Sequence, residues 1–291
     1  MMRILTILLF SVFTVFFVCA QDELYNGDIS YTDEDIQMVE AYFRMIESKS
    51  SLPFGDLVIE TAKYFVNTPY VASTLEMPKE HLVINLRELD CTTFVENVIA
   101  LVATVKQGGS PAFGSFCANL GNLRYRTGAF YDYIDRLHYF SDWIYTNEQI
   151  GYVEDITRQI GGEPYALRLS FMSTHSGNYP LLKGRPAEIE AMQAVEREIS
   201  ARNVYAMIPK AKINDCASQV RNGDIICFVT NIEGLDVTHV GFAYWKGDVL
   251  GFIHASSVAK KVFIDPKHLQ GYAENVKSTI GIMVVRPGGK F

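Results

Sequence analysis

The hydrophobic pattern of the sequence changes its period near residue 204. Before that point apolar residues recur at helical spacing, whereas beyond it they follow the two-residue period of strands, with glycine-containing turns between several runs. The predicted strands cover 204–208, 224–230, 239–245, 249–255, 261–264 and 279–286. Helices followed by a meandering antiparallel sheet predict an α+β fold.

The helical half begins with two short helices. Asp33 is the predicted N-cap of a helix through Ile46, and Asp56 is the predicted N-cap of a second helix. A third helix is predicted to start at Cys91 and to stop at Gly108-Gly109.

Residues 110–205 are predicted to form a mostly helical insertion. One helix is expected over 136–148 and another over 187–201, opened by Pro186 at the first-turn position that accepts proline. The segment is rich in aromatic side chains, among them Tyr133 and Trp143. This density is typical of a core, and the alternative is an aromatic-lined groove for a sugar or a peptide.

Residues 1–20 have the parts of a secretory signal peptide. Arg3 is followed by an apolar run over 4–18, and Val18 and Ala20 suit cleavage before residue 21. The run is shorter than the ~20 residues that a spanning helix needs. We therefore expect an exported, periplasmic protein whose mature chain, 21–291, is one domain. Cys19 offers the alternative of a lipid anchor, although the bulky residues before it do not suit such a signal.

Composition argues against several functions. The formal net charge is −7 and no basic patch occurs, which argues against a nucleic-acid partner.

The cysteines after the leader are Cys91, Cys117, Cys216 and Cys227. None lies in a CxxC pair, so neither a zinc site nor another cofactor is indicated. Cys117 and Cys227 are predicted to be buried small hydrophobes. No later run is long enough to span a membrane, and a monomer is expected.

Cys91 stands where a polar, turn-forming run over 85–90 meets a strongly apolar helical pattern. Its thiol therefore lies in the first turn of a buried helix, where free N–H groups and the helix dipole favour the thiolate and lower the cysteine pKa. Cys91 is the candidate nucleophile. Glu96, further along this helix, points elsewhere and is expected to make a buried hydrogen bond.

Two histidines, His239 and His254, lie on neighbouring predicted strands with a Gly-Asp turn between them. A hairpin turn over 246–248 would place them almost opposite each other, with Cβ atoms about 5 Å apart on one face. Two imidazoles in contact have the geometry of a base and the residue that orients it. Together with the thiol they are the parts of a cysteine hydrolase.

Five motifs support this interpretation by their order along the chain. They are Thr68-Pro69-Tyr70, Leu89-Asp90-Cys91-Thr92-Thr93-Phe94-Val95, Gly223-Asp224-Ile225-Ile226, His239-Val240-Gly241 and Ile253-His254-Ala255. In this order they resemble the NlpC/P60 cysteine peptidases, which are papain-like cell-wall hydrolases. The run 89–96 and the aromatic segment 136–143 resemble one branch of that superfamily, the DUF1460 group of N-acetylmuramoyl-L-alanine amidases.

The resemblance implies a papain-like core in which the helix that begins at Cys91 packs on the antiparallel sheet. It also implies that Cys91 attacks an amide carbonyl, that His239 acts first as base and then as acid, and that His254 orients His239. Tyr70 matches the family tyrosine that adds a hydroxyl donor to the oxyanion site.

Two departures from the NlpC/P60 pattern favour the amidase branch. Thr92-Thr93 replaces the usual Ser-Gly pair after the cysteine, which narrows the cleft, and 110–205 has no counterpart in a minimal domain. The expected reaction is cleavage between the lactyl group of N-acetylmuramic acid and L-alanine in muropeptides or other peptidoglycan fragments. The alternatives are an endopeptidase that cuts between γ-D-glutamate and a diamino acid, and a catalytically idle muropeptide-binding module.

Four further residues are candidates for the oxyanion site or for substrate binding: Tyr70, Asp90, Thr92 and Arg87. The oxyanion is expected near the backbone N–H of Cys91, because donors already point outward at a helix start. Asp90 is interpreted more cautiously as the N-cap of the helix. Arg87 is a candidate for binding a substrate carboxylate, with ordinary surface charge as the alternative.

Overall fold

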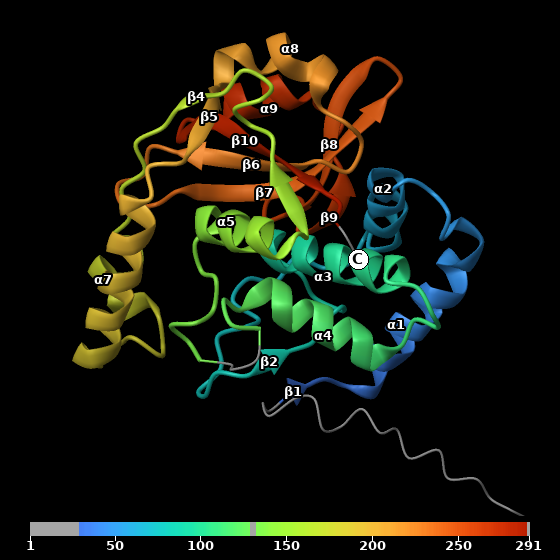
Figure 1. The fold of residues 1–291 in the computed structure, drawn as a ribbon, viewed down its shortest axis with the longest axis horizontal. Coiled ribbons are helices and arrows are strands. Elements are labelled where there is room, and N and C mark those ends of the chain that lie inside the picture. Colours follow the sequence, from blue (N-terminus) through green and yellow to red (C-terminus); the bar gives the residue numbers. More distant parts are fainter. Residues whose placement is uncertain (1–28, 129–131, 290–291) are drawn as a thin grey trace, which may run out of the picture.

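The computed structural model describes residues 29–128 and 132–289, and an antiparallel sheet forms its centre (Figure 1). The strand order is β4-β5-β10-β6-β7-β8-β9, and β3 pairs with β10. The bounds are β3 (Val153–Asp155), β4 (Glu163–Pro164), β5 (Ala206–Pro209), β6 (Ile225–Thr230), β7 (Val237–Lys246), β8 (Val249–Ser256), β9 (Lys261–Ile264) and β10 (Thr279–Pro287). A separate parallel pair joins β1 (Ile29–Ser30) to β2 (Leu82–Val83).

Helices α1 to α7 precede the strands β5 to β10 in the chain, whereas α8 and α9 lie between strands, and the helices pack around the sheet (Figure 1). Their bounds are α1 (Asp33–Ile46), α2 (Phe54–Tyr64), α3 (Cys91–Lys106), α4 (Phe113–Arg124), α5 (Phe140–Ile150), α6 (Phe171–Thr174), α7 (Pro186–Ala201), α8 (Ile213–Cys216) and α9 (Leu269–Asn275). Single 3₁₀ turns occur at 47–49, 176–178, 210–212 and 217–219. The predicted α+β class is confirmed.

Both faces of the sheet are covered, as the central strand β6 shows. Ile225 and Cys227 pack into the larger core with α1 to α5, whereas Ile226 and Phe228 pack into a second core with α8 and α9. All six residues of β6 are buried. The side chains of β6 point alternately into the two cores. The register of the strands paired with β6 therefore fixes which core each of their side chains faces.

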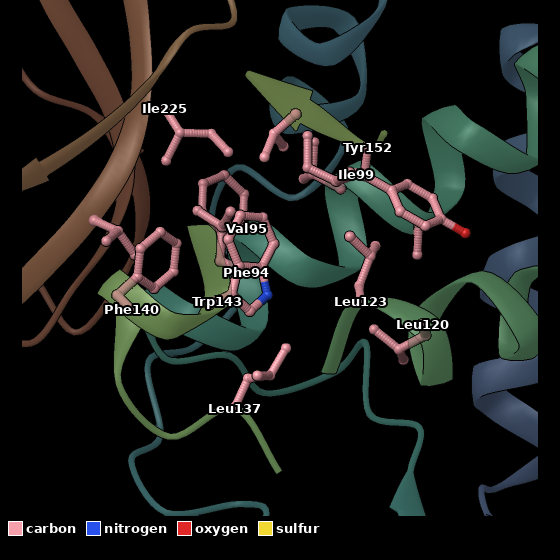
Figure 2. Packing of buried hydrophobic residues seen from close by; sticks show 14 of the residues in the cluster. Phe94, Val95, Ile99, Leu120, Leu123, Leu137, Phe140, Trp143, Tyr152 and Ile225 are labelled. Atoms are coloured by element: carbon pink, nitrogen blue, oxygen red, sulfur yellow. The ribbon is translucent and has the colours of Figure 1, made fainter. Parts of the chain in front are cut away.

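Helix α3 lies at the centre of the larger core. Every residue from Thr93 to Thr104 is buried. Figure 2 shows Phe94, Val95 and Ile99 of this helix surrounded by Trp143 of α5, Leu123 of α4 and Ile225 of β6. A helix packed on every side cannot shift easily, because protein cores are close-packed. The first residue of α3 is therefore held in place by the body of the helix.

Several predicted elements agree with the structure, and others need correction. The start of the helix at Cys91, the helix over 187–201 and the strand over 261–264 are confirmed. The helix predicted over 136–148 instead begins at Phe140, because Arg136 is bound in an extended segment by the backbone of Leu75 and by Glu76.

The N-caps predicted for the first two helices are also wrong. Thr32 rather than Asp33 caps α1 and forms a capping box with Asp35. Helix α2 starts at Phe54, directly after Pro53, so Asp56 lies in its first turn instead of capping it.

The structure adds elements that the sequence did not predict, including α4 and α9. Within 110–205 it contains α4, α5, α6 and α7 together with the short strands β3 and β4. The predicted signal peptide and Cys19 lie outside the described residues. Across the described ranges, the helices lack the length and apolar character needed to cross a membrane.

Candidate active site

The start of α3 is built to hold Cys91 in a fixed position. The carboxylate of Asp90 accepts the N–H of Thr93 at 2.8 Å, and the Thr93 hydroxyl accepts the N–H of Asp90 at 2.9 Å. This reciprocal capping box confirms Asp90 as the N-cap and makes Cys91 the first helical residue. Because the cap uses the N–H of Thr93, the N–H of Cys91 remains available at the helix start.

Cys91 meets the sheet at the backbone of Val240. The pairing between β7 and β8 runs from Lys246↔Val249 to Phe242↔Ile253. Val240 lies two residues beyond this ladder, and its N–H donates to the Cys91 thiol. Cys91 thus lies next to the residue that follows His239.

His239 and His254 are hydrogen-bonded to each other. Nε2 of His239 lies 2.6 Å from Nδ1 of His254, and the ring centroids are 4.7 Å apart in an edge arrangement. The predicted contact is confirmed, but the predicted register is wrong. The turn is formed by Gly247 and Asp248 alone, and continuation of the ladder places Gly241 opposite His254. The two histidines are therefore diagonal neighbours on one face, a separation that side chains as long as imidazole can bridge.

A bulge sets the orientation of His239. Phe228 of β6 pairs with His239, but the next pair is Val229 with Val237, so Thr238 is an extra residue on β7. Such bulges bend a strand and change the direction of its side chains, and they are common beside active sites. His239 lies directly after this bulge.

Gly241 provides the space that the diagonal contact needs. A Cβ atom at this position would lie 2.8 Å from Cβ of His254 and 2.8 Å from the carbonyl oxygen of Ile253. Gly241→Ala is therefore expected to displace His254 and to lower kcat/KM about 100-fold, the cost of a misplacement of about 1 Å. Steady-state kinetics will measure it, with Gly177→Ala as control, because a Cβ there meets nothing within 4 Å. Full activity of Gly241→Ala would show that the close approach is unimportant.

Aromatic rings enclose both histidines. His254 stacks on Phe252 at 4.3 Å, and His239 stacks on Phe228 at 5.8 Å. Burial lowers the pKa of both imidazoles below the ordinary histidine value, and repulsion from His254 lowers the pKa of His239 further. The pair is therefore neutral at pH 7.

The Cys91 thiol is also neutral at rest. Burial, followed by the nearby Asp90 carboxylate, raises its pKa to about 12, although the N–H of Val240 and the donors of Thr92 act in the opposite direction. The prediction of a lowered pKa is wrong, because desolvation outweighs the favourable helix start. Cys91 and His239 both lie in the described part of the chain, and they make no direct hydrogen bond with each other.

Three of the four further candidates lie at the thiol. Thr92 contributes side-chain and backbone donors to Cys91, and Asp90 caps its helix. Tyr70 is held near by backbone pairing with Leu89, and burial together with the Cys91 charge raises its pKa to about 12. Arg87 instead makes a salt bridge of 3.2 Å with the buried Asp35. Its role in binding a substrate carboxylate stays a prediction.

Sequence reasoning missed two residues of the site. Asp265, directly after β9, has a carboxylate oxygen 3.3 Å from Nε2 of His254. Tyr272, on α9, has its ring centroid 6.1 Å from that of His239 and a pKa raised to about 12 by burial and by the charges of Asp265 and Cys91. Neither residue belongs to a local motif, so neither position gave a signal in the sequence. Over the described part of the chain there is no group of three or more ligand-type side chains that would hold a metal ion.

A family model described as AmiA-like, N-acetylmuramoyl-L-alanine amidase-like, matches residues 60–282. The chain belongs to this AmiA-like family. The matched range contains Cys91, His239, His254 and Asp265. Comparison with curated proteins found no match.

Solved structures support membership of the AmiA-like family. An N-acetylmuramoyl-L-alanine amidase from Bacteroides uniformis is 35% identical, with a TM-score of 0.76 over 81% of this chain and 99% of that one. A protein from Bacteroides fragilis described as a putative xylanase is 40% identical, with a TM-score of 0.74 over 78% of this chain and 99% of that one.

A more distant structure has the same fold. A Legionella pneumophila protein assigned to DUF1460 is 23% identical, with a TM-score of 0.66 over 88% of this chain and 96% of that one. The predicted relation to amidases is thereby confirmed at the level of the family, and the predicted relation to DUF1460 at the level of the fold.

Proposed function

We propose that the chain is a cysteine amidase that cleaves the bond between the lactyl group of N-acetylmuramic acid and L-alanine in peptidoglycan fragments. The observation that carries this proposal is the bonded pair His239–His254, joined through Val240 to a thiol at a helix start. A nucleophile beside an oriented base is the arrangement of acyl-transfer enzymes. Membership of an amidase-like family favours an amide as the substrate.

The proposal extends to the superfamily, the domain organisation and the location of the chain. We assign the chain to the papain-like NlpC/P60 superfamily on its five ordered motifs, with one domain over 21–291. The leader-like residues 1–20 support export to the periplasm, where peptidoglycan fragments are present, and we propose that the enzyme acts there as a monomer without a cofactor.

In the first step of the proposed reaction, Sγ of Cys91 attacks the lactyl carbonyl carbon and the thiol proton passes to His239. Since Nε2 of His239 is engaged by His254, Nδ1 is the ring nitrogen that takes the proton. Negative charge develops on the carbonyl oxygen, where the N–H of Cys91 and the hydroxyl of Tyr70 would stabilise it. The neutral resting state means that proton transfer accompanies the attack.

The tetrahedral intermediate then collapses. The bond from carbon to the alanine nitrogen breaks, and His239 returns its proton to that nitrogen, which leaves as the free amine of the stem peptide. The lactyl group remains on Cys91 as a thioester. Water, deprotonated by His239, then attacks the thioester and releases the sugar with a free carboxylate and the thiol of Cys91.

The pH dependence of kcat/KM tests the neutral resting state. His239 must be unprotonated to act as base, and its lowered pKa means that activity is lost only on acidification below the ordinary value of about 6.5. Because the pKa of Cys91 is raised, activity is expected to stay level through pH 9. Loss of activity between pH 8 and 9 would instead indicate a thiolate–imidazolium pair that exists before attack. The measurement is kcat/KM from pH 4 to pH 10 on one muropeptide.

Product analysis by mass spectrometry tests the reaction itself. A disaccharide muropeptide is incubated with the protein in heavy-oxygen water. The expected products are a sugar that carries the label on its lactyl carboxylate and an unlabelled stem peptide that begins with L-alanine. A labelled disaccharide–L-alanyl–D-glutamate would identify the alternative endopeptidase, and binding without any product would identify the idle binding module.

A glycosidase is the remaining alternative, because one relative is described as a putative xylanase. Glycoside hydrolysis normally needs two carboxyl groups that flank the scissile bond. Asp90 and Asp265, the carboxylates found beside Cys91 and His254, are engaged by the helix cap and by His254. We therefore expect no cleavage of xylo-oligosaccharides, which the same mass-spectrometric assay will check.

A further inference from the structure

Asp265 is held in a fixed orientation behind the two histidines. Its Oδ1 accepts the N–H of Lys267 at 2.8 Å, and its own N–H donates to the carbonyl of Phe252 at 3.0 Å. The second oxygen, Oδ2, faces Nε2 of His254 at 3.3 Å. The side chain is only 7% exposed. One carboxylate oxygen is thus used by the backbone and the other is left for His254.

His254 has a partner on each ring nitrogen. Nδ1 faces His239 at 2.6 Å and Nε2 faces Asp265. A neutral imidazole has one N–H, and an ionised carboxylate only accepts. Nε2 of His254 therefore carries the proton and donates it to Asp265, which leaves Nδ1 of His254 as an acceptor.

The protonation of His239 follows from that of His254. Since Nδ1 of His254 accepts, Nε2 of His239 must be the donor in the bond between them. Nδ1 of His239 is then unprotonated, which is the form that can take a proton from a thiol. Each hydrogen bond determines the tautomer of the next ring.

We propose that Asp265 is a positioning residue that acts through His254 to set the tautomers of both histidines and so keeps Nδ1 of His239 available as the base. The proposal rests on the proposed cysteine amidase function. Asp265 thereby adds a carboxylate to the set of Cys91, His239 and His254, and this carboxylate does not touch the reacting atoms. The negative charge of Asp265 also favours protonation of His239, so it stabilises the imidazolium that forms during attack.

Replacement of Asp265 by asparagine reverses the donor pattern while keeping the shape. The asparagine oxygen takes the N–H of Lys267, so its NH₂ group faces His254 and donates. His254 must then accept at Nε2 and donate from Nδ1, which forces His239 to accept at Nε2 and to carry its proton on Nδ1. That tautomer cannot act as the base.

Kinetics distinguish this role from a structural one. Asp265→Asn is expected to lower kcat by about 10²- to 10⁴-fold with KM little changed, as a wrong histidine tautomer does in serine proteases. Asp265→Ala, which leaves Nε2 of His254 without a partner and both tautomers accessible, is expected to lose less. A merely structural side chain would give the opposite order, because asparagine preserves packing. Asp248→Asn, exposed in the β7–β8 turn, is the matched control and should behave as wild type.

Chemical rescue adds a second readout. A cavity of about 310 Å³ is lined by residues of β7 and β8 and of the segment after β9, among them Lys246, Asp265 and Lys267. A small carboxylate such as formate can therefore reach the space that Asp265→Ala leaves. Formate is expected to restore activity to Asp265→Ala and to have no effect on Asp265→Asn.

Imidazole ¹⁵N NMR reads the tautomers without any substrate. In wild type, Nδ1 of His239 should have the signal of an unprotonated nitrogen, and in Asp265→Asn that of an N–H, with His239→Gln and His254→Gln used for assignment. An unchanged tautomer in Asp265→Asn, or a greater kinetic loss in Asp265→Ala without rescue, would overturn the proposal. A tautomer change in a protein that cleaves no muropeptide would refute the proposed function and leave the role of Asp265 standing.

Discussion

Replacement of Cys91 by alanine is expected to reduce amide cleavage by about 10⁶-fold, the loss found when the nucleophile of a hydrolase is removed. The variant should fold normally, because the cap between Asp90 and Thr93 does not involve the thiol and the body of α3 stays packed. Single-turnover release of the stem peptide measures the rate, and circular dichroism on heating checks the fold.

Cys117→Ala is the matched control. Cys117 is a free thiol on α4, 3% exposed and packed in the larger core as predicted, away from the histidines. It is expected to keep the wild-type rate although it loses some core packing. Retention of full activity by Cys91→Ala would remove the nucleophile from the proposed mechanism.

The largest loss of stability is expected from Arg124→Met. Nε of Arg124 lies 2.7 Å from Oε2 of Glu96, and its Nη1 donates to the carbonyl of Val83 at 2.7 Å. Both charged side chains are only 2% exposed. Removal of one partner from a buried pair leaves the other charge uncompensated and costs about 3–5 kcal/mol of unfolding free energy. Urea denaturation at pH 7 will measure it.

The pH dependence of this loss of stability shows whether it comes from an uncompensated buried charge or from a cavity. Burial raises the pKa of Glu96, and Arg124 opposes that rise. Without Arg124 the pKa of Glu96 in the folded state rises further, so the folded state prefers a protonated Glu96. The destabilisation should therefore be largest at neutral pH and shrink as the pH falls towards about 4.3, the ordinary value that applies to the unfolded chain.

Two variants complete this test. Glu96→Leu combined with Arg124→Met removes both charges and is expected to regain most of the stability. Arg44→Met breaks an exposed pair with Glu40 and should leave the unfolding midpoint unchanged. If Arg124→Met were no less stable than wild type, the pair would contribute nothing. The buried hydrogen bond predicted for Glu96 is already present in the structure.

Local sequence signals predicted the helix start at Cys91 better than they predicted its surroundings. The change from a polar run to an apolar helical pattern located the start of α3 at Cys91, because capping and burial both act within a few residues. The start of the helix predicted from Arg136 was wrong because Arg136 itself forms ion pairs with Glu76 and Glu80, far away in the chain. No local pattern reports such long-range partners.

The contact between the histidines was predictable but its register was not. The sequence hardly distinguishes a turn over 246–248 from a turn of only Gly247 and Asp248. The choice between these turns nevertheless changes the residue of β7 opposite His254 by two positions. Asp265 reaches His254 only because β8 and β9 pair as they do, with His254 opposite Phe263. Its role was therefore visible only after the sheet had been assembled.

The position of β10 has a consequence for how this protein matures. The most C-terminal of the described strands lies between β5 and β6 in the interior of the sheet. Until residues 279–287 have been synthesised and inserted, β6 lacks one neighbour and the surface that supports β7 and its histidine is incomplete. Pairings between such distant segments form slowly, because long loops must close first. The surroundings of His239 and His254 are thus completed only late in folding, after the last described strand has paired.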